Sequence, residues 1–181
     1  QPEATRLVYE AHGIRFLRPT RLDELLAWRR DWPDARLVAG GTELAVAITK
    51  HGASWPMLLS VEGVEELRAI RRHEDHWSIG AAATLTAIEE TLAGEFPALD
   101  TMLRVFGSRP VRHRATLGGN LATASPISDM APVLMALDAR VVLRSHHAER
   151  IVPIEAFFVG YRQSAIARDE VLCAILLPRH V

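Results

Sequence analysis

One long stretch limits how this chain can fold. Residues 116–129 read TLGGNLATASPISD, in which Asp129 carries the single charge and four side chains are hydroxyls. The adjacent glycines Gly118 and Gly119, followed by Pro126, disfavour both a helix and a strand. The pattern therefore predicts a neutral, hydroxyl-rich loop between two segments with clear hydrophobic patterning.

A second pair of glycines lies earlier, in VAGGTE at residues 38–43. It follows a predicted buried strand and precedes TELAVAITK, which predicts a short helix or an extended apolar segment, with Thr42 as its natural cap. Gly40 and Gly41 let the backbone turn sharply, so consecutive amide N–H groups can form an anion-binding concavity. The start of the helix adds partial positive charge. A tight turn that only joins strand to helix explains the same residues.

The rest of the chain alternates between strand-like and helix-like patterns. A strand near 14–19, a helix over 22–31 and a strand over 35–41 predict a βαβ unit. The later elements are mainly antiparallel: a hairpin over 66–85, a helix over 86–107 broken near Gly94 and Pro97, a helix over 128–139, a hairpin around 146–149 and a strand over 169–178. We expect an α+β fold of two lobes, with residues 1–13 as a linker or tether, 14–55 as the first lobe and 56–181 as the second.

Composition excludes several classes of function. The 181 residues carry a net charge of −1, which gives no global basic field for nucleic acid or an anionic membrane. The longest apolar run, residues 130–137, is far shorter than the roughly 20 residues of a membrane span. The N-terminal residues lack a secretory signal pattern, and Cys173 alone forms neither a disulfide nor a metal cluster. We expect Cys173 to be inert core, the compartment to be cytoplasmic, and the partners to include no nucleic acid and no membrane.

Taken together, the two glycine stretches predict a nucleotide-like ligand. Two backbone concavities that face one cleft suit a diphosphate, and the neutral groups of Thr116, Asn120 and Thr123 suit sugar or ribityl oxygens. Phe106 can stack on an aromatic ring or belong to the core. Asp129 can cap the following helix, accept from a ribose hydroxyl, or do both.

Three motifs resemble the FAD-binding domain of the xanthine dehydrogenase family, the flavin domain of molybdenum hydroxylases. They are VAGGTEL, ATLGGNLATASPISDMAPVLMALDA, and FFVGYRQS with DEVL close behind. The resemblance covers residues 14–180 and implies a two-lobed, PCMH-type α+β domain, with a small βαβ lobe and a larger lobe of antiparallel sheet and helices. The stretch TASPISD favours the xanthine branch over the related flavin subunits of carbon monoxide dehydrogenase and hydroxybenzoyl-CoA reductase.

The resemblance also implies which residues contact FAD. The first glycine loop would wrap the diphosphate, the second would bind the flavin nucleotide, an aromatic residue at Phe106 would pack near the adenine, and Leu172 would lie along the isoalloxazine ring. The implied FAD-binding residues are Leu37, Val38, Ala39, Gly40, Gly41, Thr42, Glu43, Leu44, Phe106, Thr116, Leu117, Gly118, Gly119, Asn120, Thr123, Asp129 and Leu172.

The family implies an oxidoreductase that works only as part of a larger complex. Electrons from a substrate oxidised at a molybdopterin cofactor would pass through [2Fe–2S] clusters to FAD and on to NAD⁺. The expected partners are an iron–sulfur domain and a molybdenum-binding large subunit or domain. We expect no catalytic acid or base and no metal site in this chain. The alternatives are the flavin subunit of a related molybdenum hydroxylase, of the carbon monoxide dehydrogenase or hydroxybenzoyl-CoA reductase type, and a non-catalytic FAD-binding module.

Two other groups of residues have simpler explanations. His73, Asp75 and His76 fall at a predicted hairpin tip, where a solvated turn explains them better than a metal site. The basic run from Arg109 to Arg114 is typical of a solvated face; docking to an acidic partner and help in holding ligand phosphates are the alternatives.

Overall fold

The first sheet contains the predicted βαβ unit. The structure, a computed structural model, describes residues 5–179. Four strands are arranged in the order β1-β2-β4-β3, in which β2, β4 and β3 are parallel and β1 is antiparallel to β2. Their bounds, with the two helices that connect them, are β1 Leu7–Ala11, β2 Ile14–Arg18, α1 Leu22–Asp31, β3 Arg36–Val38, α2 Thr42–His51 and β4 Met57–Ser60.

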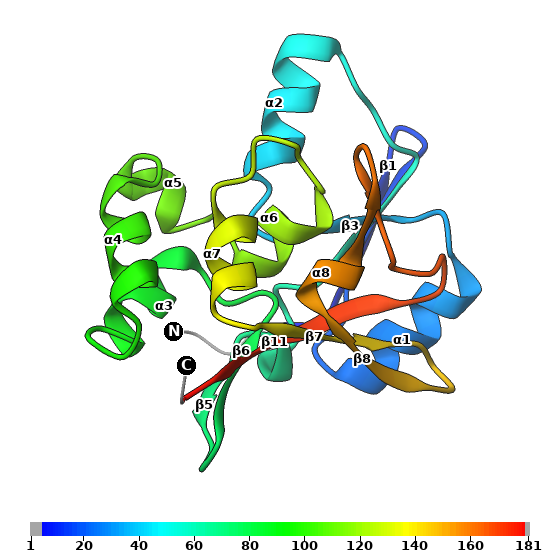
Figure 1. Ribbon diagram of the computed structural model, residues 1–181. Helices are drawn as coiled ribbons and strands as arrows, with labels where there is room; N and C mark the ends of the chain where they lie inside the picture. Colours follow the sequence, from blue (N-terminus) through cyan, green and yellow to red (C-terminus); the bar gives the residue numbers. More distant parts are fainter. Residues whose placement is uncertain (1–4, 180–181) are drawn as a thin grey trace.

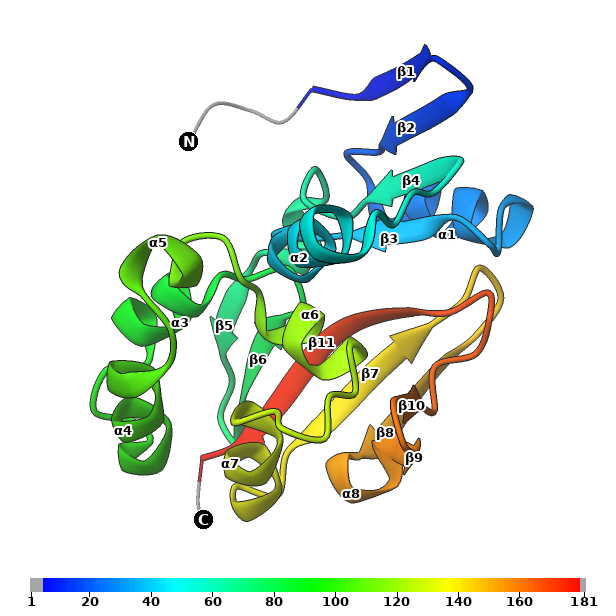
Figure 2. The ribbon, with the colours of Figure 1, turned by 90° about the horizontal axis from the view of Figure 1, so that it is seen from above.

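Two expectations about this region differ from the structure. Residues 7–11, expected to belong to a linker, form β1, which lies at the outer edge of the molecule (Figure 2). A two-residue turn at His12 and Gly13, both at positive φ, joins it to β2. Four of the five β1 residues are exposed, so no alternating hydrophobic pattern marks the strand. The boundary between the two lobes, expected after residue 55, also differs. It would assign β4 to the second lobe, although β4 pairs with β2 and β3 in the first sheet.

The second sheet is larger and antiparallel, in the order β5-β6-β11-β7-β8 (Figure 1). Both expected hairpins occur, as β5–β6 and β7–β8. The predicted long helix is split into α3 and α4, as its Gly94 and Pro97 indicated. The bounds after β4 are η1 Glu65–Leu67, β5 Ile70–Arg72, β6 His76–Gly80, α3 Leu85–Thr91, α4 Pro97–Val105, α5 Arg109–Arg112, α6 Leu117–Ala122, α7 Met130–Ala136, β7 Arg140–Arg144, β8 Glu149–Pro153, α8 Ile154–Phe157, β9 Phe158–Gly160, β10 Gln163–Ser164 and β11 Val171–Pro178.

The molecule has two hydrophobic cores, and β11 contributes to both. The larger core packs α3, α4, α6, α7 and α8 against one face of the antiparallel sheet, where Leu172 and Ile175 point. Val171 and Cys173 point into the smaller core, which belongs mainly to α1 and the first sheet. Burial raises the pKa of the Cys173 thiol to about 12, which makes it the inert core residue that was expected. Among residues 5–179, no helix is long and apolar enough to cross a membrane.

The stretch 116–129 is not a continuous loop, because residues 117–122 form α6. Thr116 caps this helix: its Oγ1 accepts a hydrogen bond from the amide of Gly119 at 3.0 Å. Two further amides are held by the chain before α3, from Leu117 N to Ala83 O at 3.3 Å and from Gly118 N to Ala81 O at 2.9 Å. These tertiary bonds outweigh the low helix propensity of two adjacent glycines, so the prediction of a loop was wrong for this part.

An ion pair between the exposed Arg150 and the buried Glu170 orders the segment before β11. The Arg150 guanidinium donates to both carboxylate oxygens of Glu170, at 2.7 and 2.8 Å, and the Ala167 amide donates to the same carboxylate at 2.7 Å. Glu170 is only 8% exposed. The hydrogen bond from Arg150 is the main reason why the pKa of Glu170 lies below its usual value of 4.5.

We predict that Arg150→Met destabilises the protein by about 2 kcal/mol at neutral pH, since it leaves a buried carboxylate without its charged partner. In a chain of this length the melting temperature should fall by roughly 4–8 °C. Because the pKa of Glu170 is lowered in the folded state, the contribution is full above about pH 4.5 and is lost as the pH falls through the lowered value. Thermal melts of both proteins across this pH range measure the effect.

Arg144→Met is the matched control on the neighbouring strand. Arg144 pairs with Glu149 at 3.2 Å, but both side chains are at least 40% exposed. An exposed pair contributes at most about 1 kcal/mol. Equal losses in the two variants, or a loss in Arg150→Met that persists at acid pH, would contradict the role given to Glu170.

Candidate functional site

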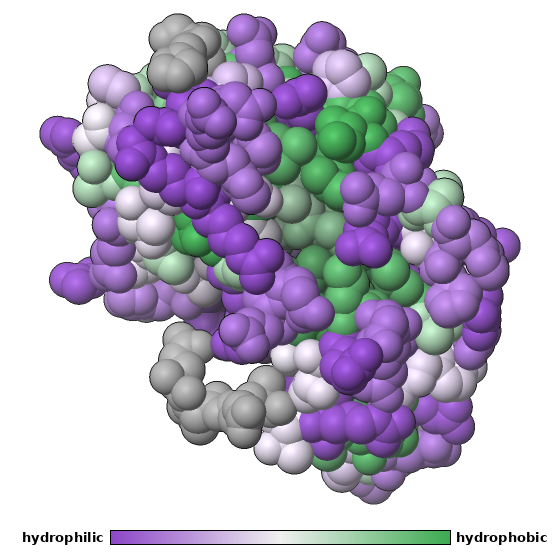
Figure 3. All heavy atoms as spheres, turned by 90° about the horizontal axis from the view of Figure 1, so that it is seen from below, coloured by the Kyte–Doolittle hydropathy of each residue, from purple (hydrophilic) through white to green (hydrophobic). Residues whose placement is uncertain are grey.

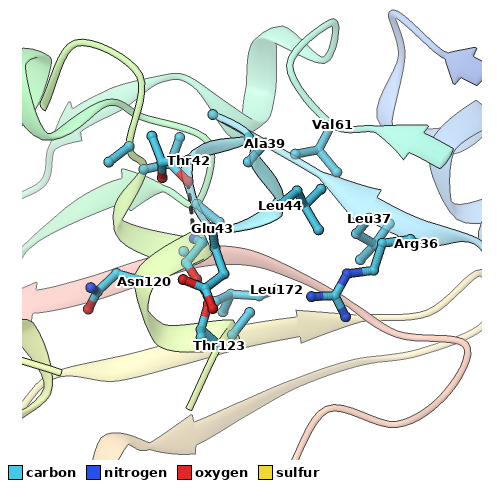
Figure 4. Close-up of a pocket in the computed structure, with 18 of the residues that line it drawn as sticks. Arg36, Leu37, Ala39, Thr42, Glu43, Leu44, Val61, Asn120, Thr123 and Leu172 are labelled. Atoms are coloured by element: carbon cyan, nitrogen blue, oxygen red, sulfur yellow. Dashed lines mark hydrogen bonds between the residues drawn. The ribbon is translucent and has the colours of Figure 1, made fainter. Parts of the chain in front are cut away.

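A cleft of about 900 Å³ lies between the two lobes, within the volume range of ligand sites. It is lined by the first glycine loop and β3 on one side, and by α6, the segment after it and the start of β11 on the other (Figure 4). All of the predicted site residues line it except Val38 and Leu117. Leu117 is fully buried in the larger core. The fold thus brings together residues that are up to 135 positions apart, from Leu37 to Leu172.

The two glycines of the first loop have different roles. A Cβ on Gly40 would lie 1.6 Å from the carbonyl oxygen of Arg114, so this position packs directly against the backbone that precedes α6. A Cβ on Gly41 would meet nothing within 4 Å, and here the requirement is the backbone angle, φ +75°. Gly40 therefore sets the distance between the two glycine stretches, and Gly41 turns the chain into α2.

The first loop supplies backbone donors to the cleft. Gly41, rather than the expected Thr42, is the N-cap of α2, and Thr42 is its first helical residue. The amide of Ala45 is the first to bond back, to Gly41 O at 2.8 Å. The amides of Thr42, Glu43 and Leu44 precede it in the first turn, where a helix offers them no carbonyl partner. Free N–H groups and the positive end of a helix dipole are the features with which helix starts bind anions.

The second glycine stretch does not form a second backbone concavity, and this expectation was wrong. The amides of Leu117, Gly118 and Gly119 all donate to groups of the protein itself. A Cβ on Gly118 would lie 2.5 Å from the Cβ of Ala81, so this glycine allows α6 to pack closely against the loop before α3. The backbone donors for an anion therefore come from the first loop.

What α6 and the following segment offer to the cleft is neutral side chains. The Ser128 hydroxyl donates to Asn120 Oδ1 at 2.7 Å, which leaves the Asn120 NH₂ group as a donor toward the cleft. Thr123 Oγ1 donates to Gly119 O at 2.9 Å and keeps its acceptor capacity. Asp129 is the N-cap residue of α7 but its side chain makes no capping bond, and it lies exposed at the cleft.

The cleft is also lined by residues that the sequence analysis did not identify as site residues. Arg29, Arg36 and Arg168 line it together with Trp55. Burial lowers the pKa of Arg29, and Arg168 donates to Asp34 Oδ1 at 3.0 Å, which lowers the pKa of Asp34. No local motif marks these arginines, because they come from α1, β3 and the segment before β11 and meet only in the folded chain.

The cleft suits a dinucleotide such as FAD. Backbone donors at the start of α2 match a diphosphate, neutral donors and acceptors on α6 match sugar or ribityl oxygens, and apolar residues such as Phe106, Leu37 and Leu172 provide walls for planar rings. Fold and site together define an α+β domain that binds a nucleotide cofactor between two lobes.

The family can be named from its sequence. The family described as the FAD binding domain in molybdopterin dehydrogenase matches residues 11–180, and the chain belongs to this family. A curated relative, xanthine dehydrogenase/oxidase of Gallus gallus, is 35% identical over 97% of this chain. The chain spans about 14% of the length of that relative.

Solved structures agree with this assignment. Carbon monoxide dehydrogenase from Hydrogenophaga pseudoflava superposes with a TM-score of 0.86 at 27% identity, covering 91% of this chain and 58% of that one. Quinoline 2-oxidoreductase from Pseudomonas putida 86 gives a TM-score of 0.86 at 28% identity, covering 95% and 60%. The α+β fold and the family are therefore those expected from the sequence motifs.

The residues set aside at the sequence level have simple environments. His76 Nδ1 lies 2.7 Å from Asp75 Oδ1, and the rings of His73 and His76 are stacked. Within residues 5–179, no group of three or more His, Cys, Asp or Glu side chains is placed to hold a metal ion. Most of the basic run is exposed, as expected of a solvated face, and Arg114 pairs with Glu62 at 2.6 Å at the surface. Arg112 is the exception, since its side chain is only 14% exposed.

We predict that Gly40→Ala destabilises the protein by about 1–3 kcal/mol, since its Cβ collides with a backbone carbonyl that has no freedom to rotate away. Gly41→Asn should fold with little loss, because asparagine tolerates positive φ and the space around this Cβ is open. Melting temperatures of the two variants measure the difference. Equal stability of Gly40→Ala and the wild type would refute the close backbone contact.

Proposed function

We propose that this chain binds FAD in the cleft and is the flavin domain of a xanthine dehydrogenase-type molybdenum hydroxylase. The observation that carries the proposal is the set of first-turn amides of α2, placed opposite the neutral side chains of α6. Thr42, Glu43 and Leu44 would hold the diphosphate through their N–H groups. Asn120 and Thr123 would bind the ribityl or ribose oxygens, and Phe106 would pack near the adenine.

FAD, when bound, would supply the redox chemistry, accepting electrons that arrive from [2Fe–2S] clusters and passing a hydride to NAD⁺. The residues of this chain bind and orient the cofactor. Leu37 and Leu172 form apolar walls at the isoalloxazine ring, and Arg29, Arg36 and Arg168 place positive charge at that end of the cleft. Since these residues only position the cofactor, we assign no catalytic acid or base to the chain.

We further propose that an iron–sulfur domain and a molybdenum-binding subunit or domain are the partners. The chain's small share of the length of its xanthine dehydrogenase relative supports this. Apolar side chains also gather in the middle of one face, with hydrophilic residues around them (Figure 3). Exposed apolar groups of this kind are typical of surfaces that contact other domains.

Two alternatives have some support. The structural similarity to carbon monoxide dehydrogenase would suit a flavin subunit of a related hydroxylase, whose substrate is chosen elsewhere in the complex. Sequence matches of 35–36% identity to xanthine dehydrogenases over almost the whole chain support the xanthine branch. A non-catalytic FAD-binding module predicts the same cleft, and reduction of the bound flavin by NADH distinguishes it.

We predict that the chain binds FAD more tightly than FMN, and that Gly41→Asp weakens FAD binding at least tenfold. The new carboxylate would face a diphosphate across the first turn of α2, and a like-charge contact costs more than about 1.4 kcal/mol when water is largely excluded. Gly41→Asn has the same shape without the charge and is the control. Fluorescence titrations with FAD and FMN measure the affinities. Equal FAD affinities of the Asp and Asn variants would exclude the first loop as the diphosphate site.

The redox role has a separate test. We predict that NADH, added without oxygen, bleaches the absorbance of the FAD-loaded protein, because a flavin dehydrogenase domain exchanges hydride with NAD⁺ in both directions. The intact complex, where this chain is part of one, is the matched positive control. FAD binding without bleaching in either preparation would favour the non-catalytic module.

A further inference from the structure

Arg112, at the end of α5, is largely buried, and its guanidinium contacts other parts of the protein. Its Nη1 group donates to two successive carbonyl oxygens, of Phe106 at 2.9 Å and of Gly107 at 2.8 Å. Its Nε lies 3.4 Å from Oε2 of Glu89 on α3. One arginine thus ties α5 to the turn that follows α4 through two hydrogen bonds strengthened by its charge. With α3 it forms an ion pair, in which its buried Nε has no hydrogen-bond partner.

The turn that Arg112 holds needs an external donor. Phe106 is the C-cap of α4, and its amide donates to Met102 O at 2.9 Å as the last bond of the helix. Gly107 follows at φ +52°, so the chain reverses here and its carbonyls leave the helical direction. Arg112 donates to both carbonyls and thereby restrains the backbone from which the Phe106 ring projects.

The Phe106 ring lies in the wall of the cleft, and Val111, next to Arg112 on α5, lines the same wall. We propose that Arg112 is a positioning residue: it holds the Phe106 ring against the adenine end of FAD and so favours the dinucleotide over FMN. This inference rests on the function proposed above, because it needs FAD in the cleft.

Arg109 provides a matched control. It begins the same short helix, carries the same charge and borders the same side cavity as Arg112, with Thr86, Glu89 and Glu90. Its side chain is exposed, and no side-chain hydrogen bond from it is found among residues 5–179. Loss of Arg109 removes a positive charge near the cleft without releasing the turn.

The first experiment compares affinities for FAD and FMN. Arg112→Met should weaken FAD binding about tenfold, the loss expected when the Phe106 ring is no longer held against the adenine, and should change FMN binding less than about twofold, because FMN lacks the adenosine half. Arg109→Met should leave both affinities within about twofold of the wild type. Arg112→Lys keeps a cationic donor and should recover most of the FAD affinity. Equal losses for FAD and FMN in Arg112→Met would overturn the proposal.

A double-mutant cycle tests whether Arg112 acts through Phe106. If it does, Arg112→Met should weaken FAD binding about tenfold in the wild-type background and hardly at all in the Phe106→Ala background. Full additivity of the two changes would overturn the proposal, since a general loss of structure weakens binding in either background.

Amide hydrogen exchange without any FAD separates failure of this inference from failure of the proposed function. Arg112→Met should speed exchange of the Phe106 amide at least tenfold, while amides of β11 keep their protection and Arg109→Met matches the wild type. Unchanged exchange of the Phe106 amide would overturn the role proposed for Arg112, even if the protein binds FAD. Faster exchange in a protein that binds no FAD would show that Arg112 holds the turn and would refute the proposed function.

Discussion

The two faces of β11 hold this fold together. The strand pairs with β6 on one side and β7 on the other, and the β7 register shifts between Leu172 and Ala174. That irregularity surrounds Cys173, which points into the core of the first lobe, whereas Leu172 borders the cleft and packs into the core of the second. Because one strand serves as a wall for both cores, neither lobe can shift far without exposing apolar surface. The cleft between the lobes is thus a consequence of core packing and exists without its ligand.

Glycines set the fine geometry of the cleft through close contacts within the protein. Gly40 lets the first loop lie directly on the carbonyl of Arg114, and Gly118 lets α6 lie directly on Ala81. Both contacts join segments that are distant in sequence, so they fix the spacing between the backbone donors of α2 and the side-chain donors of α6. Gly41 alone serves the turn itself, which is why it is the position where charge can be changed without disturbing the packing.

Much of this could be predicted from local patterns. The βαβ unit, the two hairpins and the break near Gly94 are predicted by the periodicity of hydrophobic residues and by the positions of glycine and proline. They occur in the structure as expected. β1 was missed because an exposed edge strand has no buried face to create a pattern. α6 was missed because its stability comes from bonds to Ala81 and Ala83, which no local propensity reports. Arg29 and Arg168 were missed for the same reason, since only the folded chain brings them to the cleft.

These contacts determine which element provides backbone donors to the cleft and which provides neutral side chains. Since the first amides of α6 are used by the protein itself, the two glycine stretches differ, and of these two the start of α2 is the one with backbone donors left for negative charge on a ligand. The neutral side chains of α6 then meet the uncharged part of the ligand, and the Phe106 turn, held by Arg112, closes the side near α5. A ligand that contacts all three would need a charged group, an uncharged polar chain and a ring. A flavin dinucleotide has these parts, and a mononucleotide would leave the Phe106 wall without a partner.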